Sequence, residues 1–438
     1  MFDLPKYGEG LCLARLTALL ELLAIDRARL QRRSVVITGS NGKGSTAAFC
    51  AGIGRAAGLR TGLFTSPHLY RFNERFRIDN VAIDDAQLGE LTARVARAID
   101  EIARQRNERF GAFEAQFTLA CLHFQQEACD FMVFEAGIGG RYDPVRLVGA
   151  ATTCVASVDL EHVSLLGNSL ALIASDKSDA CTAGGTIVYG ANCRPLRDHL
   201  LAYNRNRDIR SAFVRDEIEI ANERTPDTGQ AFDLNFDGYR VHDLTIGLSG
   251  AFQIENAAIA AILFLLWSRT TSMTIDEAAM TCALRDGLGE TRWPGRLETI
   301  RRDPLTVIDV GHTPDGIGRA LAGLHRAHGK EKWLAVIGVS HDKNADEIVA
   351  LLAPAFDTIV CAAAYHKGAS PNEIAAAAHR ANPAATIHIA ATIEDAVTLS
   401  TDLAATLGRR IFVAGGLFLA IEYAATVAGG KARDLAFF

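Results

Sequence analysis

The chain has 438 residues, a hydrophobic fraction of 49%, a charged fraction of 22% and a formal net charge of −6. This length is ample for two or three domains with sizeable cores. The negative charge gives no electrostatic reason to expect nucleic acid or an acidic membrane as a partner. We find no secretory signal pattern in the first residues and expect no membrane span, the most apolar stretch being 257–267. We therefore expect a cytoplasmic protein.

The first half of the chain alternates expected helices and strands. A helix with Leu at helical spacing is expected over 11–33, and the β-branched run at 35–38 predicts a buried strand. The elements expected after it are a helix at 47–57, a strand at 61–64, helices at 85–107 and 114–129, strands at 131–134 and 153–158, a helix at 169–182 and a strand at 186–189. This alternation predicts a mostly parallel sheet covered on both faces.

At the start of the second half, the alternation of helices and strands gives way to a polar stretch. The polar stretch 204–239 predicts a small antiparallel appendage, and helical sequence resumes at 252–268 before a linker at 285–295. A new alternation follows, with strands expected at 305–309, 333–337, 358–361, 386–389 and 410–413 and helices between them, the clearest at 372–380. We expect a second α/β domain of ordinary size over this part of the chain.

Nine cysteines are scattered along the chain without a C-x-x-C pair or a metal-type Cys/His spacing. An odd number of cysteines without a pattern is typical of reduced, buried thiols. The cysteines therefore indicate neither a disulfide framework nor a structural zinc site.

The motif most informative about chemistry follows the strand at 35–38. Residues 38–46 read Thr-Gly-Ser-Asn-Gly-Lys-Gly-Ser-Thr and lead into the expected helix. In a strand–loop–helix unit, backbone N–H groups and the helix dipole attract a phosphate, a lysine adds positive charge and a hydroxyl can hold Mg²⁺. We therefore expect a phosphate site around Lys43. The alternative is a flexible glycine loop.

Three more residues of the first half are candidates for this site. Glu135 ends an apolar strand before a glycine-rich turn, at the sheet edge where ligands collect. Its carboxylate could bind Mg²⁺. The alternative is a solvated carboxylate at the end of a strand. His162 follows the next expected strand, and only its proximity to Glu135 and the phosphate loop favours a metal role over ordinary hydrogen bonding. Lys177 lies on an expected helix, where composition alone would leave it on the surface.

The second domain supplies polar residues at comparable positions. Asp309 and His312 stand at the end of the expected strand 305–309, where they could meet a nucleotide bound by the first domain. Arg296, just after the linker, could be brought against phosphate by domain closure, because its planar fork suits phosphate oxygens. The alternative for all three is a polar turn and a surface arginine.

Several short motifs, taken together in chain order, are similar to those of one family. The loop at 38–45 is similar to that family's ATP loop, and residues 64–69 and 71–75 are similar to its second signature. Further similar residues are Phe113-Glu114, Thr118, 135–141, Glu161-His162, 165–167, Lys177, Gln253, Asn256-Ala257, 295–298, Asp309, His312, Pro314, Asp342-Lys343 and 415–417. The chain thus resembles the folylpolyglutamate synthase and dihydrofolate synthase family of the Mur ligase superfamily.

The resemblance implies a ligase with three substrates. ATP phosphorylates a carboxylate to an acyl phosphate, and the amine of an amino acid, L-glutamate in this family, then forms an amide. The implied fold is a P-loop-type, mostly parallel ATPase domain with a small antiparallel appendage over 1–290, followed by a Rossmann-like α/β domain over 291–438. The family is usually monomeric, so we expect a monomer whose partners are a small-molecule acid and an amino acid.

The resemblance also implies roles for individual residues. Catalytic roles fall on Lys43, Lys177 and His312, and Lys177 matches the position at which the family carries a carbamylated lysine. Two Mg²⁺ ions are implied, with Ser45, Ser66, Glu135 and His162 arranging them. The residues implied to bind ATP are Gly39, Asn41, Gly42, Lys43, Gly44, Ser45, Thr46, Gln253, Asn256, Arg296 and Asp309.

The chain departs from the family pattern mainly near the substrates. After Asp143 the family usually continues Ala-Thr-Asn, in a loop near the acid substrate, whereas this chain has Pro144-Val145-Arg146. The other departures are Glu161 for aspartate, Phe252 for histidine, Thr313 for asparagine, and Ser178-Asp179 for Ala-Gly. The ATP-binding motifs are therefore closer to the family pattern than the substrate-binding ones.

Three functions remain open from the sequence. The first is ATP-dependent ligation of L-glutamate to a folate-type acid. The second is the same chemistry on a different small carboxylic acid or amino acid. The third is a protein that binds the nucleotide but has lost ligation, which the metal-binding set argues against because a pure binder would not need it.

Overall fold

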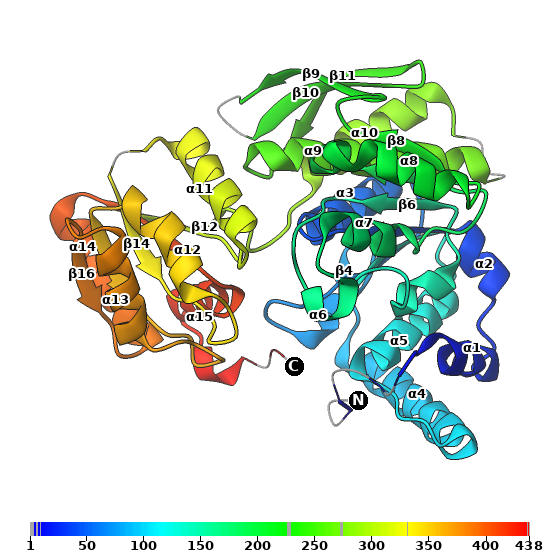
Figure 1. Cartoon of the computed structure of the whole chain (residues 1–438), viewed down its shortest axis with the longest axis horizontal. Coiled ribbons are helices and arrows are strands. Elements are labelled where there is room, and N and C mark those ends of the chain that lie inside the picture. Colours follow the sequence, from blue (N-terminus) through cyan, green and yellow to red (C-terminus); the bar gives the residue numbers. More distant parts are fainter. Residues whose placement is uncertain are drawn as a thin grey trace.

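The computed structural model describes residues 4–5, 8, 10–225, 229–271, 275–330, 332–435 and 437. Within these residues the strands form three sheets, of eight, three and six strands. The eight-stranded and six-stranded sheets, each with its own helices, lie in opposite halves of the molecule (Figure 1). The expected α/β class, with a mostly parallel first sheet and a small antiparallel one, is confirmed.

The eight-stranded sheet positions the phosphate loop. Its strands are β1 (Ser34–Thr38), β2 (Thr61–Phe64), β3 (Phe76–Ile78), β4 (Val81–Ala82), β5 (Phe131–Glu135), β6 (Thr152–Val155), β7 (Thr186–Tyr189) and β8 (Arg210–Phe213). Their spatial order is β4-β3-β2-β5-β1-β6-β7-β8, with β3 and β4 antiparallel at one edge. Because β2, β5, β1 and β6 are parallel neighbours, their carboxyl ends meet at one edge, the place where α/β sheets bind ligands.

Helices cover both faces of this sheet. The first ten in the chain are α1 (Leu13–Leu22), α2 (Arg27–Arg32), α3 (Lys43–Ala56), α4 (Asp85–Arg106), α5 (Ala112–Gln126), α6 (Val163–Leu166), α7 (Leu170–Ser178), α8 (Arg197–Arg205), α9 (Ala251–Thr270) and α10 (Glu277–Glu290). Val35 and Ile37 of β1 join the core beneath α3 and α9, while Val36 joins the core beneath α1, α4 and α5. This alternation explains why β1 is apolar at consecutive positions.

The predicted helix over 11–33 is two helices. The chain breaks after α1 because Ala24 adopts a left-handed conformation with φ 54°. The Asp26 side chain then accepts a hydrogen bond from the Arg29 N–H and starts α2. The Leu spacing was correctly assigned to helix, but the break has no strong sequence signal.

The antiparallel appendage is confirmed at a shifted position. It consists of β9 (Ile218–Arg224), β10 (Gln230–Phe236) and β11 (Tyr239–Ile246). The predicted stretch 204–239 also contains β8, which instead extends the parallel sheet beside β7. Phe232 and Leu244 bury the inner face of the appendage in the same core as α9.

Helix α9 corrects the expectation of no membrane-length apolar stretch. It has 20 residues with a mean hydropathy of 1.5 over its most apolar window, and is the one described helix that is long and apolar enough to cross a bilayer. However, 83% of that window is buried inside the protein. The helix is apolar all round because it packs between the large sheet and the appendage.

The predicted linker over 285–295 is wrong in its first half. Residues up to Glu290 belong to α10, which packs against α3. A Cβ on Gly287 would lie 2.4 Å from the Ile53 Cα, so the glycine permits the two helices to approach closely. The glycines and charges therefore mark a helix contact, not a flexible connection.

The six-stranded sheet confirms the second alternation. Its strands are β12 (Glu298–Arg302), β13 (Leu305–Ile308), β14 (Trp333–Ile337), β15 (Thr358–Cys361), β16 (Thr386–Ile389) and β17 (Arg410–Ala414). The order is β12-β13-β17-β14-β15-β16, and β12, which the sequence analysis missed, is an antiparallel edge strand. The helices between them are α11 (Pro314–His328), α12 (Ala345–Leu352), α13 (Pro371–Ala381), α14 (Ile393–Leu407) and α15 (Leu417–Val427).

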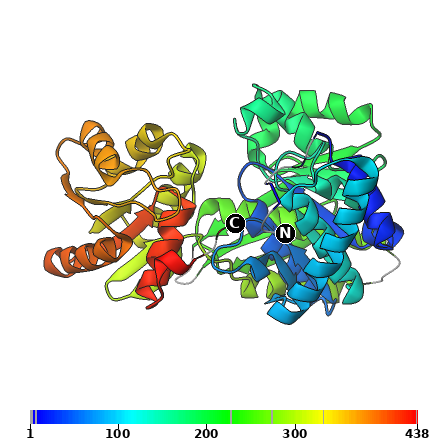
Figure 2. The same cartoon turned by 90° about the horizontal axis from the view of Figure 1, so that it is seen from below.

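The two large sheets belong to two bodies that are also distinct in the perpendicular view (Figure 2). The predicted domain division, between residues 290 and 291, falls where α10 ends and before β12 begins. This division stays a prediction.

The aromatic contact between β5 and α9 gives a test of the first core. The Phe131 ring is fully buried, with its centroid 5.2 Å from that of Phe264 and 4.4 Å from that of Trp267. We expect Phe131→Ala to lower the free energy of unfolding by about 3–5 kcal/mol, because it leaves a cavity beneath α9. Urea denaturation followed by circular dichroism measures this. The control, Leu172→Ala at a side chain 53% exposed, should change it by less than about 0.5 kcal/mol; equal effects would contradict the assigned packing.

Candidate active site

The loop between β1 and α3 has the geometry of a phosphate cradle. Gly42 caps α3 with φ 85°, a left-handed conformation that favours glycine. Lys43 Nζ donates to the carbonyl oxygens of Gly39 (2.7 Å) and Ser40 (3.2 Å), so its ammonium group lies over the loop. The first N–H groups of a 14-residue helix and a lysine therefore share one small region, as anion binding requires.

Side chains near the amino end of α9 contact this loop. A Cβ on Gly42 would lie 2.5 Å from Asn256 Oδ1, so the loop and α9 touch here. Asn256 Nδ2 donates to Gln253 Oε1 (2.9 Å), and Gln253 Nε2 donates to Ser45 Oγ (3.3 Å). The structure thus brings Ser45 to Gln253 and Asn256, which lie more than 200 residues later in the sequence. Thr46 is fully buried, and its Oγ1 has no partner among the described residues.

Glu135 lies beside the loop at the end of β5. Its register partner on β1 is Ile37, and its Oε2 accepts a hydrogen bond from the Ser66 N–H (3.0 Å). Burial raises the pKa of Glu135 to about 7, although the positive charges of Lys43 and Arg296 oppose the shift. The buried carboxylate and the Ser45 hydroxyl are hard oxygen donors, the class that Mg²⁺ prefers. Of the predicted metal residues, Ser66 contacts Glu135 through its backbone N–H group.

A second carboxylate shapes the turn after Glu135. Asp143 Oδ2 accepts from the N–H groups of Gly137 and Ile138, both at 2.9 Å, and its Oδ1 accepts from Val145 (3.0 Å). Burial raises the pKa of Asp143 to about 6. The altered loop residues Pro144-Val145-Arg146 open a short 3₁₀ helix that Asp143 caps. The departure from the family pattern therefore lies on an ordered turn.

Lys177 is buried, contrary to the surface position that composition favours. Only 1% of its side chain is exposed, and its Nζ lies 2.8 Å from Glu161 Oε1. Burial lowers the pKa of Lys177. Burial alone would raise the pKa of Glu161, but the charges of Lys177 and Lys43 lower it to about 2. The carbonyl oxygen of Lys177 would lie 2.5 Å from a Cβ on Gly140, so this helix packs directly on the glycine turn.

His162 differs from Glu135 and Lys177 in being exposed. It precedes α6 with φ 46°, and its side chain is exposed. Partial desolvation lowers its pKa, and the charges of Lys177 and Lys43 act in the same direction. The structure describes no hydrogen bond between His162 and Glu135, Ser45 or Ser66, so its place in the predicted metal set stays a prediction.

Polar groups of the second half face the loop. Asp309, buried after β13, accepts from the N–H groups of Gly311 (2.8 Å) and Leu297 (3.0 Å), and burial raises its pKa. Arg296 forms no hydrogen bond or ion pair with any residue that the structure describes, but its charge influences the pKa values of Asp309 and Glu135. Desolvation and the charge of Lys343 lower the pKa of His312, although its ring keeps contact with solvent.

Two hydrogen bonds connect the halves at the loop itself. Asn41 Nδ2 donates to Asp315 Oδ2 (3.1 Å), and Thr313 Oγ1 donates to Asn41 Oδ1 (3.4 Å). Thr313 also caps α11 by accepting from the Gly316 N–H (3.1 Å). Gly44 is covered from the same direction, since its Cβ would lie 3.0 Å from Trp293 Nε1.

Sequence reasoning missed several residues of this region. Asp315 and Trp293 had no assigned role because their contacts cross between the halves of the chain. Ser157, whose Oγ holds the N–H (2.7 Å) and carbonyl oxygen (2.9 Å) of Asn41, carries no motif signal. Asp176, which accepts from the Gly140 N–H (2.9 Å), had one available signal, its place beside Lys177.

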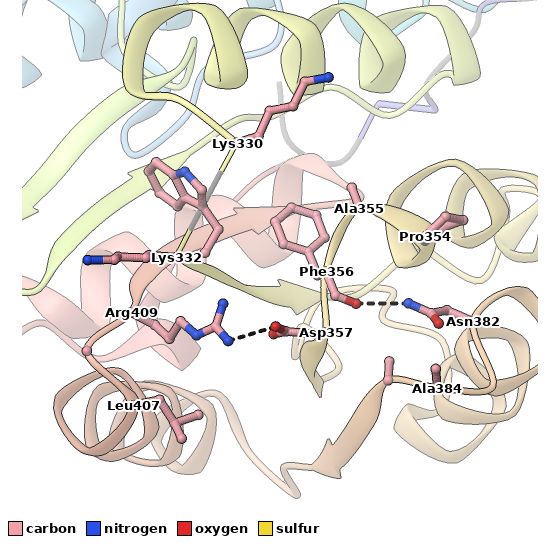
Figure 3. A pocket seen from close by; sticks show the side chains of 13 residues that line it. Lys330, Lys332, Pro354, Ala355, Phe356, Asp357, Asn382, Ala384, Leu407 and Arg409 are labelled. Carbon is pink, nitrogen blue, oxygen red and sulfur yellow. Dashed lines mark hydrogen bonds and ion pairs between the residues drawn. The ribbon is translucent and has the colours of Figure 1, made fainter.

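A cavity of about 750 Å³ lies elsewhere, at the amino ends of the second sheet's strands (Figure 3). Trp333, Asp357 and Arg409 at its lining mark the starts of β14, β15 and β17, the edge opposite Asp309. Arg409 pairs with Asp357 (2.7 Å), and Lys330 and Lys332 point in different directions. This cavity is separate from the phosphate loop.

Comparisons with known proteins agree with this geometry. Residues 295–417 match the family model for the Mur ligase glutamate ligase domain. A folylpolyglutamate synthase of Lacticaseibacillus casei is 32% identical over 343 residues, which cover 77% of this chain and 78% of that protein. The chain belongs to the folylpolyglutamate synthase family.

Two further members of the folylpolyglutamate synthase family define the extent of the likeness. A probable bifunctional folylpolyglutamate synthase/dihydropteroate synthase of Halobacterium salinarum is 33% identical over 89% of this chain, but the chain spans only 46% of that relative's length. The crystal structure of a Mycobacterium tuberculosis folylpolyglutamate synthase complexed with ADP and AMPPCP has a TM-score of 0.86 and 27% identity, covering 97% of this chain and 96% of that one. The likeness to a nucleotide complex supports ATP binding by this chain.

The raised pKa of Glu135 gives a test of this site. Between about pH 4.5 and 7 the folded protein binds a proton at Glu135 that the unfolded chain releases, so stability falls as pH rises through this window. We expect Glu135→Gln, which keeps an acceptor for Ser66, to reduce the loss of unfolding free energy between pH 5 and 8 by about 1–3 kcal/mol. Urea denaturation in EDTA measures both proteins. Identical pH dependence would show that Glu135 is not buried as assigned.

Proposed function

We propose that this protein is an ATP-dependent ligase that joins L-glutamate to a folate-type acid. A carboxylate oxygen of the acid attacks the γ-phosphorus of ATP, which forms an acyl phosphate and releases ADP. The glutamate amine then attacks the acyl carbon, the C–O bond to phosphate breaks, and the amide and inorganic phosphate leave with loss of the amine proton. The names of the relatives support this acid and this amino acid over the alternative of another substrate pair.

The observation that supports the proposal most is the arrangement around the phosphate loop. Lys43 lies over the loop on one side, Glu135 stands on the adjacent strand, and Asn41 binds Asp315 of the second half. Phosphoryl transfer depends on positioning and charge neutralisation, and an acyl phosphate must be shielded from water. A site between two α/β bodies meets both needs, and a protein that only binds nucleotide would need neither.

The residues present fit the proposed metal ions. Glu135 has a carboxylate oxygen, Oε1, without a hydrogen-bond partner in the described part of the chain, and Ser45 supplies a buried hydroxyl. Mg²⁺ bound there would neutralise phosphate charge. We propose Ser45 and Glu135 as ligands, with Ser66 and His162 completing the predicted set for two ions.

Carbamylation of Lys177 is also part of the proposal. Addition of CO₂ requires a neutral amine and releases a proton, and burial lowers the pKa of Lys177 in the direction that favours this form. The product would be an anion near the positive charge of Lys43, whose influence extends to both Lys177 and Glu161.

The domain division, further residue roles, location and oligomeric state belong to the same proposal. We propose that residues 1–290 and 291–438 act as two domains, that Gln253, Asn256, Arg296 and Asp309 bind the nucleotide, and that His312 lies near the reacting groups. We propose that the enzyme is a cytoplasmic monomer with small-molecule partners.

Phosphate release tests the proposed function. We expect release that requires ATP, L-glutamate and an acid together, with activity on dihydropteroate or tetrahydrofolate in a panel that includes non-pterin carboxylic acids. Lys43→Ala should lower kcat at least about 100-fold, because the charge over the phosphates is lost, while circular dichroism stays unchanged. Phosphate release without any acid would indicate a simple ATPase. Activity only on non-pterin acids would indicate that the altered loop after Asp143 marks another substrate.

A further inference from the structure

Arg75 is a buried cation that forms no ion pair with any residue the structure describes. Only 5% of the residue is exposed. Its Nε donates to His68 Nδ1 (2.9 Å), its Nη1 donates to Gln116 Oε1 (2.9 Å), and its guanidinium lies 5.4 Å from the centre of the Phe72 ring. Because Nδ1 accepts this bond, it carries no proton. Within the part of the chain that the structure describes, Arg75 forms no ion pair.

This environment is unusual for a buried guanidinium. Removing such a charge from water is costly, so buried arginines are normally paired with carboxylates. Arg15 shows the normal case, since it is 1% exposed and its Nε lies 2.7 Å from Glu114 Oε2. Burial lowers the pKa of Arg75 to about 10; the charges of Glu135 and Glu74 oppose this shift, but neither residue forms an ion pair with Arg75 that would supply a direct counter-charge. An anion from outside the chain would supply that counter-charge.

The position of Arg75 indicates which anion this is. The Thr65 N–H donates to the Arg75 carbonyl oxygen (3.2 Å), and the next N–H, of Ser66, donates to Glu135 (3.0 Å). In the sheet order β3-β2-β5-β1, Glu135 on β5 separates the Arg75 side from the phosphate loop that follows β1. In an in-line transfer the acceptor oxygen attacks from the side of the γ-phosphate opposite ADP. With the triphosphate on the loop after β1 and its γ-phosphate directed toward Glu135, Arg75 would lie on that side.

We propose that Arg75 binds the reacting carboxylate of the acid substrate and holds it toward the γ-phosphate of ATP. The inference rests on the proposed function and adds to it a residue that touches the acid. With Nε and Nη1 directed to His68 and Gln116, the Nη2 group has no partner among the described residues and is the donor for the carboxylate. His68 and Gln116 orient the guanidinium without neutralising its charge.

Gln116→Glu is the sharpest test, because it is nearly isosteric and supplies an internal counter-ion. If Arg75 binds the substrate carboxylate, the new carboxylate competes with it, and KM for the acid should rise at least about 10-fold. The dissociation constant for AMPPCP should change less than about 2-fold. If Arg75 only supports the fold, the new ion pair leaves KM for the acid unchanged, which would overturn the proposal. Gln126→Glu, at an exposed position of the same helix, is the charge-matched control.

Substitution of Arg75 itself gives a second readout. Arg75→Gln should raise KM for the acid at least about 10-fold, and Arg75→Lys should recover part of the loss because it restores the charge but not the planar fork. Should Arg75→Gln fail to fold, Gln116→Glu still decides the question, since it removes no charge.

Acid binding to the wild-type enzyme separates this inference from the proposed function. Equilibrium binding of dihydropteroate and tetrahydrofolate is measured with AMPPCP present. If neither acid binds the wild type, the proposed function is overturned and the Arg75 assignment with it. If the wild type and Gln116→Glu bind the acid equally well, the Arg75 assignment alone is overturned.

Discussion

The left-handed turn at Gly42 is the constraint on which the arrangement of this site depends. An anion cradle needs a helix that starts immediately after a strand, with backbone N–H groups facing outward, and only a residue without a Cβ fits between that turn and Asn256. Asn256 begins the chain of hydrogen bonds that reaches Ser45, so α9 must place its amino end under the loop. The long apolar body of α9, buried between sheet and appendage, fixes that placement.

The electrostatics of the site follow from this packing. Carboxylates buried at the sheet edge, Glu135 and Asp143 among them, have raised pKa values because water is excluded. Three cations, Lys43, Arg296 and Arg75, lie near enough to Glu135 for their charges to lower its pKa against the effect of burial. Charges arranged in this way destabilise the protein alone, and the proposed phosphates, metal ions and substrate carboxylate would match them. Functional sites commonly break the rule that buried charges are paired.

Much of this architecture could be predicted from the sequence. The strands of the second alternation have strong apolar runs between turn residues. In the phosphate loop, the glycines, the lysine and the hydroxyl residues follow one another in an order that suits phosphate binding. The failures occur where tertiary contacts decide the outcome. Gly287 resembled a linker residue because the proximity of Ile53 cannot be inferred from local sequence. Lys177 resembled a surface residue because its partner Glu161 lies on a separate loop, and only the family resemblance suggested a role for it. Arg75 belonged to a recognised motif, but its burial without an ion pair to any described residue is visible only in three dimensions.

Crystals of the enzyme grown with AMPPCP and Mn²⁺ would test the central claim most directly, because the anomalous scattering of manganese locates the metal independently of the phosphates. We predict an anomalous peak within coordination distance of Ser45 Oγ and the Glu135 carboxylate, with the triphosphate analogue on the loop around Lys43. A metal peak away from Glu135, or a nucleotide bound away from the loop, would contradict it.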